Sequence, residues 1–302
     1  MFSLAVAPGL DPVMNPIPHR RFGRLDLRGS VLGLGTVKWG RNQKLRYAPF
    51  ELPTDETLGH LLDTAEQLGI NVLDTAPAYG VAEERLGQIL ARRSQPFILI
   101  TKVGEEFERG EARYDFSSEA VRHSVERSLK RLRRGSLDLV LLHCPPDDLP
   151  AIVDSPALET LAELKAKGWL RYFGVSSMTL EGGLKAVDLS DAVMVSWNFQ
   201  YREQEEVLLK AGREGKAAFL KKALLSGNLG SSSLQGGRSV LETCVASALD
   251  MSEVSSLIAG TINPEHLAEN ARTAIKWHAA LGCAVPEEVP RLEHRTQPTE
   301  VQ

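Results

Sequence analysis

Four residues of the sequence have side chains suited to proton transfer, namely Asp74, Tyr79, Lys102 and His143. Asp74, Lys102 and His143 each lie at the carboxyl end of a short apolar stretch, and Tyr79 follows Asp74 by five residues. If the stretches are β-strands, side-chain alternation places each polar residue on one face with apolar neighbours. If those faces line the interior of a closed barrel, a carboxylate, a phenol, an amine and an imidazole converge at its mouth.

Each of these residues also has a structural interpretation. A single histidine at a strand end is more often a hydrogen-bonded core residue than a catalytic one, and a single tyrosine usually packs. Four such residues at one barrel mouth are much harder to explain by packing alone. Because an uncompensated buried amine or carboxylate is costly, we expect Lys102 and Asp74 to pair with each other.

The elements that position these residues alternate along the chain between short apolar stretches and amphipathic ones. Eight strands, each followed by a helix, are what a closed parallel barrel of the (β/α)8 or TIM type requires, an α/β fold of roughly 250 residues. The chain has 302 residues, of which 43% are hydrophobic, so one such domain fits. The predicted strands are Val31–Thr36, Asn71–Thr75, Phe97–Val103, Leu137–Cys144, Arg171–Ser176, Ala192–Asn198, Ala217–Ala223 and Ser255–Thr261. The predicted helices are Thr54–Leu68, Ala82–Arg93, Ser117–Arg133, Pro156–Lys167, Leu180–Val187, Glu203–Arg213, Val240–Leu249 and Pro264–Ala279.

The main structural alternative is an open, doubly wound sheet. Such a sheet normally carries a G-x-G-x-x-G turn after its first strand, and the segment Gly33–Lys38 does not complete that spacing. Ahead of the first barrel strand, the segment Arg21–Ser30 is predicted to be a β-hairpin that turns at Arg28-Gly29 and caps the barrel floor. The predicted fold is therefore a TIM barrel with an N-terminal β-hairpin cap.

The sequence predicts a single domain flanked by two segments of a different kind. Residues 1–20 are expected to be a disordered or peripheral arm, residues 21–284 the barrel, and residues 285–302 a peripheral tail rich in Pro and Glu. The segments Gly40–Pro53 and Gly104–Phe116 interrupt the alternation after strands, and we expect them to be substrate loops on the carboxyl-terminal face of the barrel.

Composition limits the classes of partner. The formal net charge of −4 gives no electrostatic reason to expect binding to nucleic acid or to an acidic membrane surface. The three cysteines, Cys144, Cys244 and Cys283, are widely spaced and form no metal-binding or disulfide pattern. No signal peptide and no apolar run of membrane-spanning length is recognised. We expect a cytoplasmic monomer or small homo-oligomer that binds no metal, nucleic acid or membrane.

One long segment, Gly69–Gly87, resembles the signature of the aldo-keto reductase family, G-x-x-x-x-D-T-A-x-x-Y-G-x-x-E-x-x-L-G. The resemblance runs from about Arg21 to Ile275, which is nearly the whole chain. The first signature is long and specific, whereas the others are moderate singly and strong as an ordered set. The other matching segments are Ile100–Val103, Ser128–Leu132, Leu139–Pro145, Lys167–Ser176 and Asn263–Asn270.

By this resemblance, Asp74, Tyr79, Lys102 and His143 are the catalytic tetrad, and none of the four is substituted. Tyr79 would protonate a carbonyl oxygen while a reduced nicotinamide delivers hydride to the carbon, and His143 would orient the carbonyl. A free tyrosine has a pKa of about 10, and a charge pair at about 4 Å is worth roughly 4 kcal/mol at an effective dielectric constant of about 20. We therefore expect Lys102 to lower the pKa of Tyr79 and to make it a stronger acid near neutral pH.

The resemblance also implies a nicotinamide cofactor, with NADP(H) preferred and NAD(H) possible. Met194 stands where the family holds the nicotinamide amide with a glutamine, and Lys221 stands where an aromatic residue usually stacks on the ring. Gly260 and His266 replace a Lys and an Arg that often bind the 2′-phosphate, so we expect weak selectivity for NADPH over NADH. The predicted cofactor contacts are Gly35, Thr36, Ser176, Ser177, Lys221, Leu224, Ser226, Gly227, Leu229, Gly260, Thr261, Asn263, His266, Glu269 and Asn270.

Three functions are compatible with such a barrel. The main prediction is an NAD(P)H-dependent carbonyl reductase or alcohol dehydrogenase that acts on a small-molecule carbonyl or alcohol. A second is a catalytically weak, cofactor-binding regulatory or redox-sensing protein, which some potassium-channel β subunits resemble; the altered nicotinamide contacts favour it and the intact tetrad disfavours it. A third, a barrel hydrolase or isomerase, lacks a metal cluster or an obvious carboxylate pair.

Overall fold

The computed structural model describes residues 16–45, 49–227 and 237–281. Within these residues, eight parallel strands form a closed barrel in which each strand hydrogen-bonds to the next along the chain and the last closes on the first. The barrel strands are β3 (Leu32–Gly35), β4 (Val72–Asp74), β5 (Ile98–Val103), β8 (Leu137–His143), β9 (Leu170–Ser176), β10 (Ala192–Ser196), β11 (Ala217–Lys221) and β12 (Ser256–Ala259).

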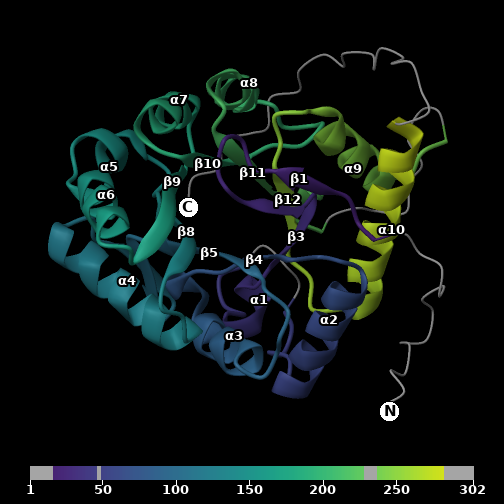
Figure 1. Cartoon of the computed structure of the whole chain (residues 1–302), viewed down its shortest axis with the longest axis horizontal. Coiled ribbons are helices and arrows are strands. Elements are labelled where there is room, and N and C mark those ends of the chain that lie inside the picture. Colours follow the sequence, from purple (N-terminus) through teal and green to yellow (C-terminus); the bar gives the residue numbers. More distant parts are fainter. Residues whose placement is uncertain (1–15, 46–48, 228–236, 282–302) are drawn as a thin grey trace.

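Helices form a ring around the barrel, and one follows each strand in the described part of the chain (Figure 1). These are α2 (Asp55–Gln67), α3 (Ala82–Leu90), α4 (Ser118–Leu132), α6 (Ala157–Ala166), α7 (Leu180–Leu189), α8 (Glu205–Glu214), α9 (Val240–Asp250) and α10 (Pro264–Leu281). Shorter helical segments lie in the connections, namely α1 (Val37–Gly40), η1 (Pro77–Tyr79), α5 (Leu149–Val153) and η2 (Leu225–Gly227). The predicted (β/α)8 barrel is confirmed, with element ends that differ from prediction by a few residues.

The buried apolar residues form an inner and an outer cluster. The outer cluster lies between strands and helices, and the inner one fills the barrel. The inner cluster contains Phe22, Leu25, Leu27, Val72, Ile100, Leu139, Leu141, Ala192, Met194, Ala217 and Phe219. Asp74, Lys102 and His143 each lie two residues beyond a member of the inner cluster on the same strand, so the predicted orientation toward the barrel interior is confirmed.

The N-terminal hairpin exists, but its predicted turn at Arg28-Gly29 is wrong. Strand β1 (His19–Arg21) pairs antiparallel with β2 (Arg28–Ser30), so the connection runs over residues 22–27. The turn lies there because Phe22 inserts into the barrel and meets Phe219 edge to face, with ring centroids 5.2 Å apart. Gly29 is needed for close packing rather than for a turn, since a Cβ there would lie 2.4 Å from the Phe22 ring.

Residues 16–20 are not a peripheral arm, which corrects the predicted N-terminal boundary of the barrel. The side chain of Ile17 is buried in the outer cluster, and its backbone nitrogen donates to the Leu68 oxygen at 3.0 Å. The guanidinium of Arg20 donates to three carbonyl oxygens at the end of α9 and just beyond it. Residues 1–15 and the predicted tail, 285–302, lie outside the described residues.

The segment Gly104–Phe116, predicted to be a loop, folds as a second hairpin. Strand β6 (Glu105–Glu108) pairs antiparallel with β7 (Glu111–Tyr114). The two residues between them, Arg109 and Gly110, have φ of 52° and 82°. Positive φ at both positions is typical of the tight turns whose twist matches that of a hairpin. The charged residues of both strands hid this hairpin from an apolar pattern search.

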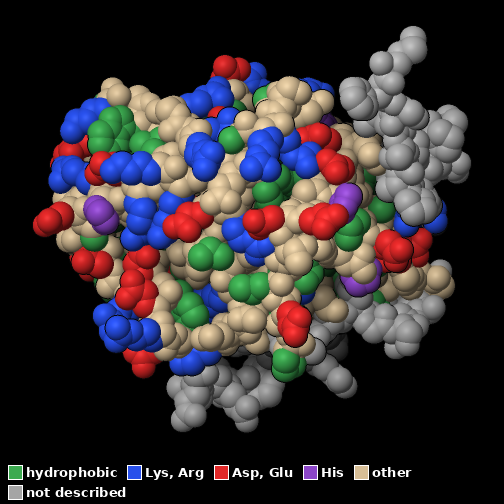
Figure 2. Space-filling model, turned by 90° about the horizontal axis from the view of Figure 1, so that it is seen from below, with side chains coloured by type: hydrophobic (Ala, Val, Ile, Leu, Met, Phe, Trp, Pro, Cys, Tyr) green, Lys and Arg blue, Asp and Glu red, His purple; other side chains and the backbone are tan. Residues whose placement is uncertain are grey.

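The outer surface is polar. On the face shown in Figure 2, basic and acidic side chains are interspersed, in keeping with the small net charge of −4. No helix in the described ranges combines the length and the hydrophobicity needed to cross a bilayer.

Candidate active site

The four predicted catalytic side chains meet at the carboxyl-terminal mouth of the barrel. Asp74 and His143 end their strands and Lys102 is the penultimate residue of β5, so parallel pairing brings them to the same rim. Tyr79 ends η1, and the chain turns sharply after it at Gly80, which has a φ of 62°. The Tyr79 ring lies between two of the others, with its centroid 4.8 Å from Lys102 Nζ and 6.2 Å from the His143 ring.

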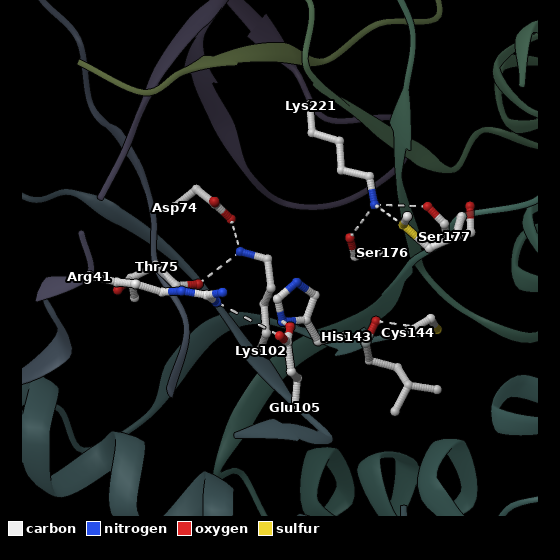
Figure 3. A network of polar contacts seen from close by, with 12 residues as sticks. Arg41, Asp74, Thr75, Lys102, Glu105, His143, Cys144, Ser176, Ser177 and Lys221 are labelled. Carbon is white, nitrogen blue, oxygen red and sulfur yellow. Dashed lines mark hydrogen bonds and ion pairs between the residues drawn. The ribbon is translucent and has the colours of Figure 1, made fainter. Parts of the chain in front are cut away.

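Lys102 is the buried cation of this group, and Figure 3 shows its amine between two acceptors. Its Nζ donates to Asp74 Oδ1 at 2.6 Å and to the Thr75 carbonyl oxygen at 2.9 Å. Burial alone would lower the pKa of Lys102, but the charges and hydrogen bonds of Asp74 and Tyr79 outweigh it and raise the pKa above its usual value. The predicted Asp74–Lys102 pair is therefore present, and Lys102 is positively charged at neutral pH.

The pKa expected for Tyr79 is wrong. Burial raises the pKa of Tyr79 to about 12, although Lys102 acts in the opposite direction. Asp74 and Glu105 add negative charge nearby, which also disfavours the phenolate. The expectation counted the charge of Lys102, held by Asp74, but it left out the burial of the phenol and the negative charge of Glu105.

Glu105, the first residue of β6, is a member of the site that the sequence analysis missed. Its Oε2 lies 2.7 Å from Nδ1 of His143, and its Oε1 lies 3.9 Å from Nη1 of Arg41 (Figure 3). Burial would raise the pKa of Glu105, but His143, Arg41 and Lys102 together lower it. The sequence did hold one signal for Glu105, because only Gly104 separates it from β5, the strand that carries Lys102.

Lys221, at the end of β11, is a second lysine at the mouth. Its Nζ lies 2.9 Å from Ser176 Oγ and 2.8 Å from the Ser177 carbonyl oxygen, with the Met178 sulfur at 3.4 Å. Burial, reinforced by the neighbouring charge of Lys222, lowers the pKa of Lys221 to about 7. Unlike Lys102, whose amine donates to a carboxylate, Lys221 hydrogen-bonds to uncharged oxygens, so its amine changes protonation state near neutral pH.

The hydroxyl of Ser177, predicted to contact the cofactor, is already engaged. Gln204 Nε2 donates to Ser177 Oγ at 2.8 Å and to the Thr179 carbonyl oxygen at 2.9 Å, while Gln204 Oε1 accepts from the Ser196 nitrogen. Asp148 secures the same turn by accepting from the backbone nitrogens of Met178 and Thr179. Gln204 and Asp148 thus fix the segment after β9, and neither stands in a pattern that a sequence search would detect.

The segment after β11 has an unusual backbone. Lys222, Leu225 and Ser226 all have φ between 50° and 59°, a region that costs energy for residues other than glycine. Leu224, Ser226 and Gly227, all predicted to approach the cofactor, belong to this turn. Strain of this kind is common where a loop is held against a ligand.

The predicted contacts after β12 lie at the start of α10. Thr261 Oγ1 accepts from the Asn263 nitrogen at 3.1 Å, and Asn263 Oδ1 accepts from the Glu265 nitrogen at 2.8 Å. Both side chains therefore stabilise the entry into the helix. The helix carries the remaining predicted contacts, of which His266 and Glu269 are exposed and Asn270 is buried.

Several features of the mouth fit a polar dinucleotide. Three buried hydroxyls at the carboxyl ends of β3, β4 and β10, those of Thr36, Thr75 and Ser196, have no hydrogen-bond partner among the described residues. Buried hydroxyls are normally paired. Of the three, Ser196 lies two residues beyond Met194 of the inner cluster, so its hydroxyl is on the barrel-facing side and can pair with a polar ligand. Beside them, Gly35 and Gly260 approach closely, and a Cβ at Gly260 would meet nothing within 4 Å. Leu229, also predicted to contact the cofactor, lies outside the described residues.

Comparisons with known proteins give a consistent result. The model of the aldo/keto reductase family matches residues 31–234. The fold is similar to a putative aldo-keto reductase from Pseudomonas aeruginosa, with a TM-score of 0.77 and 40% identity over 86% of this chain and 96% of that one. It is also similar to an aldo-keto reductase from Bacillus halodurans in its holo form, with a TM-score of 0.72 and 26% identity over 85% and 90% of the two chains.

Curated relatives match over a shorter region. An uncharacterized oxidoreductase from Bacillus subtilis is 32% identical over 63% of this chain and 59% of its own length. L-galactose dehydrogenase from Arabidopsis thaliana is 30% identical over 56% of this chain and 51% of its own length. The chain thus spans between half and three fifths of the length of these two relatives.

Proposed function

The chain belongs to the aldo/keto reductase family, and from this premise we propose that it is an NAD(P)H-dependent oxidoreductase that interconverts an aldehyde or ketone with an alcohol. The convergence of Asp74, Tyr79, Lys102 and His143 at the barrel mouth is the observation that carries the proposal. The reduced nicotinamide supplies hydride to the carbonyl carbon when it is bound.

Tyr79 supplies the proton to the carbonyl oxygen. With a pKa of about 12 it stays protonated throughout the physiological range, so its proton is available at every pH at which the protein works. An alkoxide formed by hydride addition is about as basic as hydroxide, whose conjugate acid has a pKa of about 15.7, so proton transfer from Tyr79 remains downhill. The positive charge of Lys102 then stabilises the phenolate that the transfer leaves behind.

We propose NADP(H) as the preferred cofactor and NAD(H) as a possible one. Gly35, Thr36 and Gly260 border the mouth at the ends of β3 and β12, and the N-terminus of α10 offers backbone N–H groups and a favourable dipole to a phosphate. His266, exposed on the first turns of that helix, is the candidate hydrogen-bonding partner of the 2′-phosphate.

The test is titration with NADPH and NADH, followed by a carbonyl screen of the wild type and of Tyr79→Phe. Aldoses belong in the screen because L-galactose dehydrogenase and a D-arabinose 1-dehydrogenase are among the similar proteins. Tyr79→Phe is expected to abolish reduction and to retain cofactor affinity. Tyr172→Phe is the matched control, because Tyr172 packs on the inner cluster and accepts from the Asp26 nitrogen at the barrel floor. Retained reduction in Tyr79→Phe would remove Tyr79 from the acid role.

The alternative, a catalytically weak cofactor-binding regulator, is favoured by one observation. Lys221 and Met194 stand in the positions of residues that hold the nicotinamide in the family, and Lys221 Nζ is hydrogen-bonded to Ser176 and to the Ser177 carbonyl. Tight cofactor binding without turnover of any carbonyl in the screen would support this alternative against the enzyme.

A further inference from the structure

The β6–β7 hairpin brings a carboxylate to the catalytic histidine from outside the barrel strands. We propose that Glu105 is a positioning residue that holds a proton on Nδ1 of His143 and stabilises the imidazolium, so that Nε2 can donate a hydrogen bond to the substrate oxygen. This inference rests on the proposed function for its effect on catalysis. Its effect on His143 itself can be measured without any substrate.

Geometry defines which nitrogen Glu105 controls. Nδ1 of His143 lies 2.7 Å from Glu105 Oε2, and both side chains are mostly buried, with exposed fractions of 18% and 10%. The contact is close although its angle is not that of a linear hydrogen bond. In Figure 3 the other ring nitrogen of His143 points away from the carboxylate. Nδ1 must carry a proton, because at this distance the lone pair of an unprotonated Nδ1 would repel the carboxylate oxygen of Glu105.

Glu105 is itself held in place. Nη1 of Arg41 lies 3.9 Å from its other oxygen, and the Arg41 guanidinium stacks over the Phe107 ring at 3.4 Å from the centroid. Phe107 belongs to the same strand as Glu105, two residues further on. Arg41 and the hairpin thus clamp the carboxylate from one side, while His143 meets it from the other. A side chain fixed in this way can set the orientation of the imidazole.

The tautomer has a chemical consequence. When Nδ1 carries the proton, a neutral His143 presents a lone pair at Nε2 and cannot donate to a carbonyl oxygen. Only the imidazolium donates from both nitrogens. Carbonyl binding through His143 therefore requires the doubly protonated ring, and Glu105 supplies the negative charge that this form needs.

The groups that face His143 act on it in opposite directions. Burial lowers the pKa of His143, Glu105 raises it, and the positive charges of Lys102 and Lys221 lower it further. The Tyr79 ring, which completes the surroundings, meets the imidazole edge to face and stays uncharged. Glu105 is thus the group that counters burial and two lysines, and its removal must make the imidazolium harder to form.

The experiment compares the wild type with Glu105→Gln, which removes the charge and keeps an oxygen that can accept from Nδ1. The His143 ring resonances are followed by NMR from pH 5 to 9 in the cofactor-free protein and are assigned by their loss in His143→Gln. The expected result is a fall in the pKa of His143 of about one unit, equivalent to a tenfold weaker proton affinity. The pH at which kcat/KM for carbonyl reduction falls should move to lower pH by the same amount.

Two further variants separate positioning from folding. Glu105→Asp is expected to restore part of the pKa of His143, whereas Glu108→Gln, at the exposed end of the same strand, should leave both the titration and the pH profile unchanged. If Glu105→Gln does not fold, the wild type still provides the test, because the carboxyl carbon of Glu105 should report the same titration step as the His143 ring.

An unchanged His143 titration in Glu105→Gln would overturn the proposal, and so would a loss of activity with an unshifted pH profile, which indicates a structural role. Independent titration of Glu105 and His143 in the wild type would overturn it as well. A protein that reduces no carbonyl would refute the proposed function but would leave the titration test intact, so the two failures are distinguishable.

Discussion

The buried pair of Lys102 and Asp74 allows a quantitative prediction for Asp74→Asn. At 2.6 Å, the attraction between the two charges is about 6 kcal/mol at an effective dielectric constant of about 20. Desolvation of both groups offsets part of this, but removal of one partner leaves a buried charge uncompensated and typically costs about 3–5 kcal/mol. Asparagine keeps an acceptor for the amine, and the Thr75 carbonyl remains at 2.9 Å. We therefore expect Asp74→Asn to lower the free energy of unfolding by about 3 kcal/mol at pH 7.

The loss should depend on pH in a defined direction. In the wild type the pKa of Lys102 is raised, so its contribution is complete below the unfolded pKa of about 10.4 and is lost only as pH rises through the higher folded pKa. In Asp74→Asn, burial without the carboxylate lowers the pKa of Lys102. The unfolded variant then binds more protons than the folded one, so the variant gains stability as pH rises toward 10. The difference between the two proteins should shrink between pH 7 and pH 9.5.

The assay is equilibrium unfolding in urea at both pH values, with the slope against urea concentration compared to verify that the same surface unfolds. Glu126→Gln is the matched control, since Glu126 pairs with Lys130 at 2.7 Å on the exposed surface of α4 and its loss should leave the midpoint unchanged. The reasoning that Asp74 holds a buried cation would be refuted if Asp74→Asn lowered the free energy of unfolding by less than about 1 kcal/mol at pH 7. It would also be refuted if the difference in that free energy between wild type and variant were larger at pH 9.5 than at pH 7.

Two other predictions concern packing and charge. Gly87→Ala should destabilise the protein by about 1–3 kcal/mol, because a Cβ there would lie 1.9 Å from the Arg131 carbonyl oxygen. Gly135→Ala is the control and should not destabilise it, because a Cβ at Gly135 meets nothing within 4 Å. Equal urea midpoints for the two variants would contradict this prediction. The pKa of Lys221 is about 7, so the side chain is charged at pH 6 and mostly neutral at pH 8. Its charge should repel the nicotinamide cation of NADP+, so we expect NADP+ to bind up to about tenfold more tightly at pH 8 than at pH 6. Isothermal titration of Lys221→Met should show no such dependence, while Lys216→Met, which changes the residue just before β11, should behave as the wild type.

The barrel and the meeting of the four candidate residues at its mouth could be predicted because their information is local. Each strand is a short apolar run, and each catalytic candidate except Tyr79 stands at or near the carboxyl end of one. Parallel strands in a closed barrel leave only one place for those ends to meet. The hairpin floor shows where local information fails. Glycine is common in turns, but Gly29 lies in a strand, where its missing side chain leaves room for the Phe22 ring. Phe22 packs inside the barrel, an environment that exists only once the barrel has closed.

The supporting residues of the site could not be predicted for the same reason. Gln204 reaches Ser177 across 27 positions of the chain, and Asp148 reaches Thr179 across 31. Each satisfies backbone or hydroxyl groups of a segment far away in the sequence. Which polar side chain fills such a need is decided by the path of the connections between strands and helices, and these paths carry no periodic pattern.

The pKa of Tyr79 shows a different limit, because two of its charged neighbours were predicted, whereas its burial and the nearby Glu105 were not. The sequence correctly places Lys102 beside the phenol and pairs it with Asp74, whose Oδ1 lies 2.6 Å from the amine, but the structure also buries the phenol and places Glu105 close enough to disfavour the phenolate. Lys102 lowers the pKa of Tyr79, but the burial of the phenol and the negative charges of Asp74 and Glu105 together outweigh that effect. The resting site therefore keeps Tyr79 protonated. In the reaction proposed above, Lys102 would stabilise the negative charge that develops on the phenol during proton transfer, as a preorganised cation does.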